Sequence, residues 1–129
     1  MNGRFSLDTN IIVARFANDK NVVARSGEAG AIFVPSIVLG ELYFGAQKSG
    51  RVEANMQRVD DLAASEAILD CDAETARHYA IIKNQLRLKG KPIPENDMWI
   101  AAIALRHDLT LVTRDAHFGN VEELRIERW

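Results

Sequence analysis

The sequence predicts an α/β fold in which strands alternate with helices around a mainly parallel sheet. Short apolar or alternating runs typical of strands recur along the chain, at residues 4–8, 31–35, 67–71, 109–113 and 124–127. Helical patterns separate these runs, and this alternation favours βα units and a mainly parallel sheet. Ligands of such folds gather at the carboxyl ends of the strands, so polar residues at those ends are candidates for a site.

The first predicted strand is "RFSLD" at residues 4–8, in which Phe5 and Leu7 point to one side and Ser6 to the other. The run ends in the polar stretch "DTN" before apolar residues resume at Ile11. A carboxylate at the end of a short apolar strand has two explanations. It caps a turn of helix, or it belongs to a site.

The second strand, "AIFVP", leads into a helix predicted over residues 35–50. Ser36 is its predicted N-cap and Gly50 its predicted C-terminal stop. Another helix is predicted over residues 52–65, where apolar residues recur at helical spacing.

The third strand, "AILDC", precedes a helix that Asp72 caps and Gly90 ends. The last long helix is predicted over residues 95–108, before the strands "LTLVT" and "LRIE". The side chains expected on the buried side of this helix are Trp99, Ile100, Ile103 and Ala104.

Length and composition indicate one ordinary globular domain over residues 1–129, with 47% hydrophobic and 26% charged residues. The single cysteine, Cys71, excludes a disulfide framework and a cysteine-based zinc site, and we expect it to be buried. No apolar run approaches the roughly 20 residues needed to span a bilayer, so a cytoplasmic protein without membrane contact is expected. The net charge of −2 argues mildly against nucleic-acid binding.

Acidic residues are predicted to meet at one edge of the sheet. Asp8 ends the first strand and Asp115 follows the fourth, so both are expected at the carboxyl edge. Asp97 lies in the first turn of the last long helix. Glu41 interrupts an otherwise apolar helix face, where a charge is costly to bury unless it is paired or bound to a cation.

Each of these acids has a simpler explanation when it is taken alone. The three aspartates are all placed where helix N-caps occur, and Glu41 fits the rim of an amphipathic helix. Taken together, clustered carboxylates repel one another unless a cation holds them ionised, and oxygen ligands favour Mg²⁺. The histidines, which are His78, His107 and His117, are expected to be surface or loop residues, which argues against zinc.

The stretches around these acids resemble the four signature blocks of the PIN domain family, and within it most closely the VapC-type toxins of bacterial toxin–antitoxin pairs. The blocks run the length of the chain in order: "LDTNII" at 7–12, "SIVLGELYFGA" at 36–46, "NDMWIAAIA" at 96–104 and "LVTRDAHF" at 111–118. Any one block alone is a weak signal, whereas the four together are specific.

The resemblance implies a three-layer α/β/α sandwich with catalytic, metal-binding acids at Asp8, Glu41, Asp97 and Asp115. It implies supporting polar residues at Thr9, Asn10 and Thr113, although Thr9 and Asn10 also suit a turn or cap. The implied activity is cleavage of RNA by water that Mg²⁺ or Mn²⁺ activates. The implied partners are an RNA substrate, a small antitoxin protein of the VapB type and a second copy of the chain in a homodimer.

The chain departs from the family pattern at two positions. Asp108 stands where glycine is frequent, so the turn into the fourth strand is open to change, and Arg114 stands where asparagine is common. The basic stretch 83–91 either holds an RNA backbone or is a solvated helix end. Tyr43, Phe44 and Trp99 are expected in the core or a dimer interface rather than as stacking platforms for bases.

One alternative to the ribonuclease prediction remains open. A PIN-like module without catalysis, acting only as a protein-binding partner, fits the same fold. The intact set of acids argues against this alternative without removing it.

Overall fold

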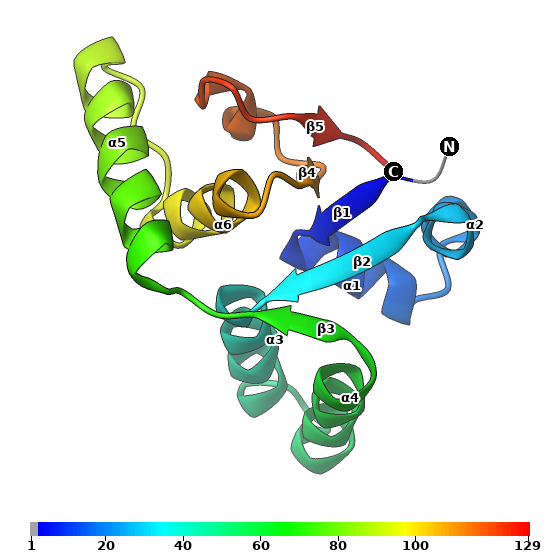
Figure 1. Ribbon diagram of the computed structural model, residues 1–129. Helices are drawn as coiled ribbons and strands as arrows, with labels where there is room; N and C mark the ends of the chain where they lie inside the picture. The colour runs from blue at the N-terminus through cyan, green and yellow to red at the C-terminus, as the bar shows by residue number, and fades with distance from the viewer. Residues whose placement is uncertain (1–2) are drawn as a thin grey trace.

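A computed structural model describes residues 3–129 and contains a five-stranded parallel sheet in the order β3-β2-β1-β4-β5 (Figure 1). The strands are β1 (Arg4–Leu7), β2 (Ala31–Pro35), β3 (Ala67–Leu69), β4 (Thr110–Val112) and β5 (Ile126–Glu127). Each lies within one of the predicted runs and is equal to it or slightly shorter. The predicted α/β fold with a parallel sheet is confirmed.

Helices connect the strands and cover both faces of the sheet, as Figure 1 shows. They are α1 (Thr9–Phe16), α2 (Lys20–Glu28), α3 (Ser36–Gln47), α4 (Val52–Ser65), α5 (Ala73–Lys89) and α6 (Glu95–Arg106), followed by the short 3₁₀ helix η1 (Ala116–Asn120). From β1 to β3 the chain moves one way across the sheet, and from β3 to β4 it moves back. Because such crossovers are right-handed, α1–α4 and α5–α6 fall on opposite faces, which gives the three layers.

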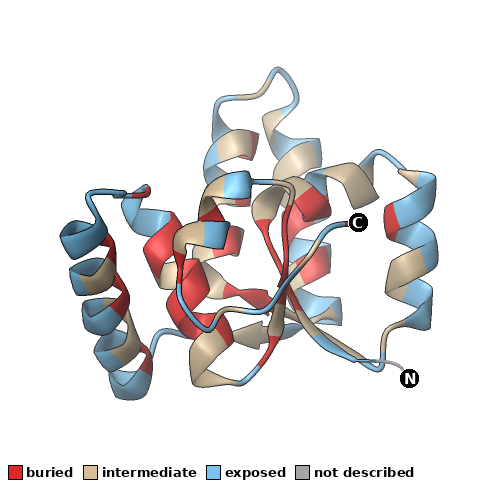
Figure 2. Ribbon diagram, turned by 90° about the horizontal axis from the view of Figure 1, so that it is seen from above, coloured by how far each residue is buried: buried red, intermediate tan, exposed pale blue. Residues whose placement is uncertain are grey.

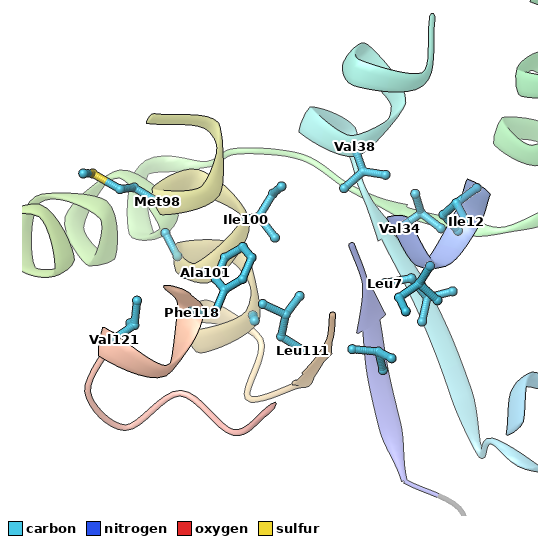
Figure 3. Packing of buried hydrophobic residues seen from close by; sticks show 14 of the residues in the cluster. Leu7, Ile12, Val34, Val38, Met98, Ile100, Ala101, Leu111, Phe118 and Val121 are labelled. Carbon is cyan, nitrogen blue, oxygen red and sulfur yellow. The ribbon is translucent and has the colours of Figure 1, made fainter. Parts of the chain in front are cut away.

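The core lies between the sheet and its helices, as the buried residues at the centre of Figure 2 show. Leu7, Ile12 and Val38 are fully buried beside α1 and α3, and Ile100 and Phe118 are fully buried beside α6 and η1 (Figure 3). Burial on both faces explains why the strands contain continuous apolar runs. Within the described residues, no helix has both the length and the apolar character needed to cross a membrane.

The predicted ends of α5 are confirmed. The Asp72 side chain accepts a hydrogen bond from the Thr75 backbone N–H, and Gly90 follows the helix in the left-handed conformation, with φ of 66°. The left-handed region carries little cost for glycine, because it has no Cβ.

The predicted ends of α3 are wrong. Pro35 occupies the N-cap position and Ser36 is already the first helical residue, without a side-chain cap bond. At the other end the C-cap is Lys48, before the predicted stop at Gly50. Proline serves here because its fixed φ suits the start of a helix and it has no N–H to leave unpaired.

The buried position predicted for Cys71 is also wrong, since its side chain is exposed. Cys71 follows the end of β3, where the chain leaves the sheet towards α5, and this edge strand offers little cover. The turn before β4 does contain a left-handed residue, because Asp108 has φ of 54°. Asp108 therefore adopts the conformation for which glycine is the usual choice.

Ser6 in β1 has no exposed surface, and its Oγ has no hydrogen-bond partner among residues 3–129. We therefore expect Ser6→Ala to raise the free energy of unfolding by about 1 kcal/mol, because it removes a buried hydroxyl that nothing satisfies. Urea denaturation monitored by circular dichroism measures this difference.

Thr75 supplies the matched control, because it is equally buried but its Oγ1 donates to Asp72 Oδ1 at 2.8 Å. Thr75→Val should lower the free energy of unfolding by about 1 kcal/mol. Equal losses for the two variants would contradict the expectation for Ser6.

Candidate functional site

A pocket of about 750 Å³ opens at the carboxyl ends of β1 and β4. In the sheet, β2 lies on one side of β1 and β4 on the other. The pocket therefore lies at the point where the strand order reverses. Its lining residues are Asp8, Thr9, Asn10, Val13, Glu41, Pro94, Glu95, Asn96, Asp97 and Asp115. All four predicted acids therefore meet here, with Thr9 and Asn10 beside them.

Asp8 combines the two roles that the sequence left open. It is the N-cap of α1, and its Oδ1 accepts from the Thr9 backbone N–H at 2.8 Å. Its Oδ2 accepts from Thr113 Oγ1 at 2.7 Å, and only 3% of the residue is exposed. These two hydrogen bonds, one from the start of α1 and one from the residue that follows β4, hold the Asp8 carboxylate in place beside the pocket.

Thr113 lies behind the pocket and joins two of the acids. Its Oγ1 donates to Asp8 and accepts from the backbone N–H of Asp115 at 3.0 Å. Asp115 itself is exposed and begins the turn into η1. One hydroxyl therefore sets the position of one carboxylate and of the backbone that carries another.

Glu41 reaches the pocket from the second turn of α3, next to the exposed Gly40 and the buried Leu42. Its Oε1 accepts from Thr9 Oγ1 at 2.6 Å. The cost of a carboxylate on this mostly apolar face is reduced by that hydrogen bond and by partial exposure.

Asp97 lies in the first turn of α6 and is 9% exposed. It is not the N-cap, which is Pro94. Its Oδ2 is 2.6 Å from Nε2 of His117, a residue that the sequence predicts on the surface or in a loop. Ligand atoms of Asp97, Asp115 and His117 all lie within 4.8 Å of one another. The only sequence signal for His117 is its place two residues after Asp115.

The environment of the pocket raises the pKa of two of its carboxyls, Asp8 and Asp97. Burial, together with the nearby Asp97 and Asp115, raises the pKa of Asp8 from 3.8 to about 6, against hydrogen bonds from Thr113 and Thr9 that lower it. Burial also raises the pKa of Asp97, where the contact with His117 opposes the shift. Across residues 3–129, no lysine or arginine forms an ion pair with any of the four acids.

The donors in the pocket fit a hard divalent cation. Carboxylate oxygens are the ligands that Mg²⁺ and Mn²⁺ prefer, and an imidazole next to them is a common orienting partner. Asn10 also lines the pocket, and its buried Oδ1 has no hydrogen-bond partner within the described range 3–129. An unpaired buried oxygen beside four carboxylates fits a position that a cation or its water satisfies.

The basic stretch 83–91 is largely occupied by contacts within the protein. Lys83 pairs with Glu95 at 2.6 Å, and Lys89 pairs with Glu122 at 3.3 Å. Arg114, which stands where asparagine is common, pairs with Asp19 at 3.0 Å and donates to the backbone oxygen of Trp129. These ion pairs weaken the expectation that the stretch 83–91 holds RNA.

Comparison with known proteins places this geometry in a family. The PIN domain model matches residues 6–124. Ribonuclease VapC2 of Haemophilus influenzae is 37% identical over 129 residues, which covers 98% of both chains. The tRNA(fMet)-specific endonuclease VapC of Shigella flexneri is 33% identical, again over 98% of both chains.

A solved structure agrees with the sequence matches. VapBC2 from Rickettsia felis, crystallised with a DNA fragment from the promoter, superimposes with a TM-score of 0.90 at 30% identity over 98% of both chains. The match covers the sheet, the helices and the ends of the strands that carry the acidic pocket. The chain belongs to the PIN domain family and, within it, to the VapC proteins.

Proposed function

We propose that this chain is the toxin of a toxin–antitoxin pair and that it cleaves RNA with the help of a divalent cation. Relatives of nearly full length are named ribonucleases, and the similar solved structure is a VapBC complex. The observation that carries the proposal is the convergence of four carboxylates in one pocket without a lysine or arginine to neutralise them. Such a pocket attracts a cation and, through the cation, a phosphate.

Asp8, Asp97 and Asp115 are the proposed metal ligands, and Glu41 binds the metal directly or orients the attacking water. The metal is Mg²⁺, with Mn²⁺ as its substitute. A divalent cation bound there lowers the pKa of water and stabilises negative charge on the phosphoryl oxygens. All four acids are catalytic residues in this proposal, because each touches the metal or the reacting water.

The other polar residues position these acids. Thr113 fixes Asp8, Thr9 fixes Glu41, and His117 fixes Asp97 through its Nε2. Asp8 is the N-cap of α1 and Asp97 lies in the first turn of α6, where the helix dipoles favour negative charge. The pocket is therefore arranged in advance for a cation and an anionic substrate.

The substrate is RNA, and the first candidate is a transfer RNA, because the relative from Shigella flexneri is named for tRNA(fMet). The expected partner is a VapB-type antitoxin, since the similar structure is a VapBC complex. The toxin acts in the cytoplasm, where its substrate is found. We also propose that the whole chain, residues 1–129, is a single PIN domain and that it forms a homodimer.

The homodimer is supported by an exposed apolar stripe on α5. Ile81 and Leu88 lie two turns apart on this helix and are 50% and 70% exposed. Light scattering on the purified toxin should give about twice the chain mass of 14.4 kDa, and Leu88→Glu should restore the single-chain mass, because a charge in an apolar interface is costly. A wild-type mass of one chain would contradict the dimer.

Antitoxin-free protein should cleave tRNA(fMet) or total RNA in the presence of Mg²⁺ or Mn²⁺. EDTA should abolish cleavage, and Asp97→Asn should reduce the rate by at least about 100-fold, because it removes a charged metal ligand while keeping its shape. Gel analysis of end-labelled RNA measures the rate.

Asp61→Asn is the matched control, since Asp61 is an exposed aspartate on α4 outside the pocket. It should cleave like the wild type. Cleavage that survives in Asp97→Asn would indicate a contaminating nuclease. A wild type that is folded and binds its antitoxin but cleaves no RNA would favour the catalytically silent protein-binding module.

Asp8→Asn should stabilise the metal-free protein at neutral pH. Because folding raises the pKa of this carboxyl to about 6, the folded state binds the proton more tightly than the unfolded state. Stability therefore falls as pH rises from about 4 to 6, by as much as about 3 kcal/mol for two pKa units. Asparagine does not ionise, so Asp8→Asn should have a much higher free energy of unfolding than the wild type at pH 7.5. Near pH 4 the difference should be small.

Thermal denaturation in EDTA at both pH values measures this difference. Added Mg²⁺ should raise the melting temperature of the wild type and have little effect on Asp8→Asn, because the ligand is lost. An equal Mg²⁺ response in both proteins would exclude Asp8 from the metal site.

A further inference from the structure

Phe44 is a large aromatic side chain that the fold leaves uncovered. It is 64% exposed and lies on α3, one turn after Glu41. The sequence predicts it in the core or in a dimer interface, and its exposure shows that the core placement is wrong. Residues one turn apart lie on the same side of a helix, so Phe44 faces the same region as the Glu41 carboxylate.

A second hollow of about 690 Å³ lies along this side of α3. Its lining residues are Thr9, Ser36, Ile37, Gly40, Glu41, Phe44, Gly45, Lys48 and Asn96. Thr9, Glu41 and Asn96 also line the acidic pocket, so the two hollows lie side by side. Its size falls within the range of roughly 300–1,000 Å³ that holds small ligands.

Two glycines, Gly40 and Gly45, line this hollow. A Cβ placed on Gly40 or Gly45 would meet no other atom within 4 Å, so the space above this part of α3 is unobstructed. A flat group is free to approach the helix surface between Glu41 and Phe44.

Lys48 supplies the positive charge of the hollow. Its Nζ lies 5.0 Å from the centre of the Phe44 ring, and it has no ion-pair partner in the part of the chain from 3 to 129. Lys83 and Lys89 on α5, by contrast, are both paired with glutamates. An unpaired cation beside an exposed ring is thus found on the α3 side.

We propose that Phe44 and Lys48 form a nucleotide subsite that holds the unpaired nucleotide next to the scissile phosphate. The base stacks on the Phe44 ring, and the Lys48 ammonium contacts the adjoining phosphate. Exposed aromatic rings interleaved with cations are the usual means of holding single-stranded nucleic acid. The inference rests on the proposed ribonuclease function, and it specifies the substrate at the point of cleavage as single-stranded.

A protein segment is the rival occupant of the hollow. An apolar segment would gain from Phe44 but leave the Lys48 ammonium without a partner, whereas a nucleotide satisfies both. The position of the hollow beside the acidic pocket also favours the substrate, because one RNA strand occupies both hollows when its phosphate is at the metal.

The test compares Phe44→Leu and Lys48→Gln with the wild type in RNA cleavage. Leucine keeps an apolar side chain but removes the stacking face, and glutamine removes the charge. Each variant should raise KM at least about five-fold with a smaller change in kcat, because binding before the chemical step is lost. Lys48→Gln should also reduce the slope of log affinity against log salt by about 0.7.

Matched controls come from α2, whose residues line neither hollow. Val23→Ala removes another exposed apolar side chain, and Lys20→Gln removes another exposed cation. Both controls should leave KM unchanged. Phe44→Trp should retain activity, and its fluorescence should be quenched by a random pool of single-stranded RNA 20-mers, corrected with the wild type.

The outcomes separate this inference from the proposed function. A wild type that cleaves, with Phe44→Leu and Lys48→Gln behaving like the controls, overturns the subsite and leaves the nuclease intact. Quenching without any cleavage supports the subsite and overturns the nuclease. The absence of both quenching and cleavage overturns both proposals. Normal cleavage with lost binding of the antitoxin assigns the surface to a protein and overturns the subsite.

Discussion

The hydrogen bond from Thr113 to Asp8 is the contact on which the rest of the site depends. It joins residues 105 positions apart, across the adjacent carboxyl ends of β1 and β4. Because the Asp8 carboxylate is buried, loss of this donor would leave a charge without adequate compensation. The same hydroxyl accepts from the backbone of Asp115, so a shift of β4 against β1 would displace two acids together.

An acidic pocket of this kind lowers the free energy of unfolding, but it supplies the carboxylates that the proposed reaction needs. Mutual repulsion and burial oppose ionisation of Asp8 and Asp97, and the described structure places no lysine or arginine in an ion pair with either carboxylate. The cost is tolerated because helices cover both faces of the sheet and Leu7, Val34 and Val112, near the carboxyl ends of its central strands, are fully buried. Carboxylates held in place before the metal arrives do not have to be gathered by it, which is the benefit of such an arrangement.

Much of this structure follows from the sequence. The parallel sheet is visible in the apolar runs, and the meeting of Asp8 with Asp115 follows from the rule that parallel strands end at one edge. Glu41 and Asp97 are also expected at this edge from their places near the starts of helices, and the family resemblance strengthens that expectation. The distances between the four acids are not fixed by their spacing in the sequence.

Other features depend on packing that no local pattern records. Helix α1 spans only Thr9–Phe16, and its buried Ile11 and Ile12 read equally well as a strand. The contact of His117 with Asp97 depends on the path of η1, and the pairing of Lys83 with Glu95 depends on how α5 meets α6. Each of these features is set by tertiary packing between residues that are separated in the sequence, which secondary-structure propensity does not describe.

The order of the strands has a consequence for synthesis of the protein. A ribosome makes Asp8 105 residues before Thr113, yet β4 must insert beside β1 before the pocket exists. A nascent chain therefore carries an incomplete set of acids until β4 has left the ribosome, because long-range pairing in a parallel sheet forms late. The topology delays assembly of the acidic pocket until most of the domain has been synthesised.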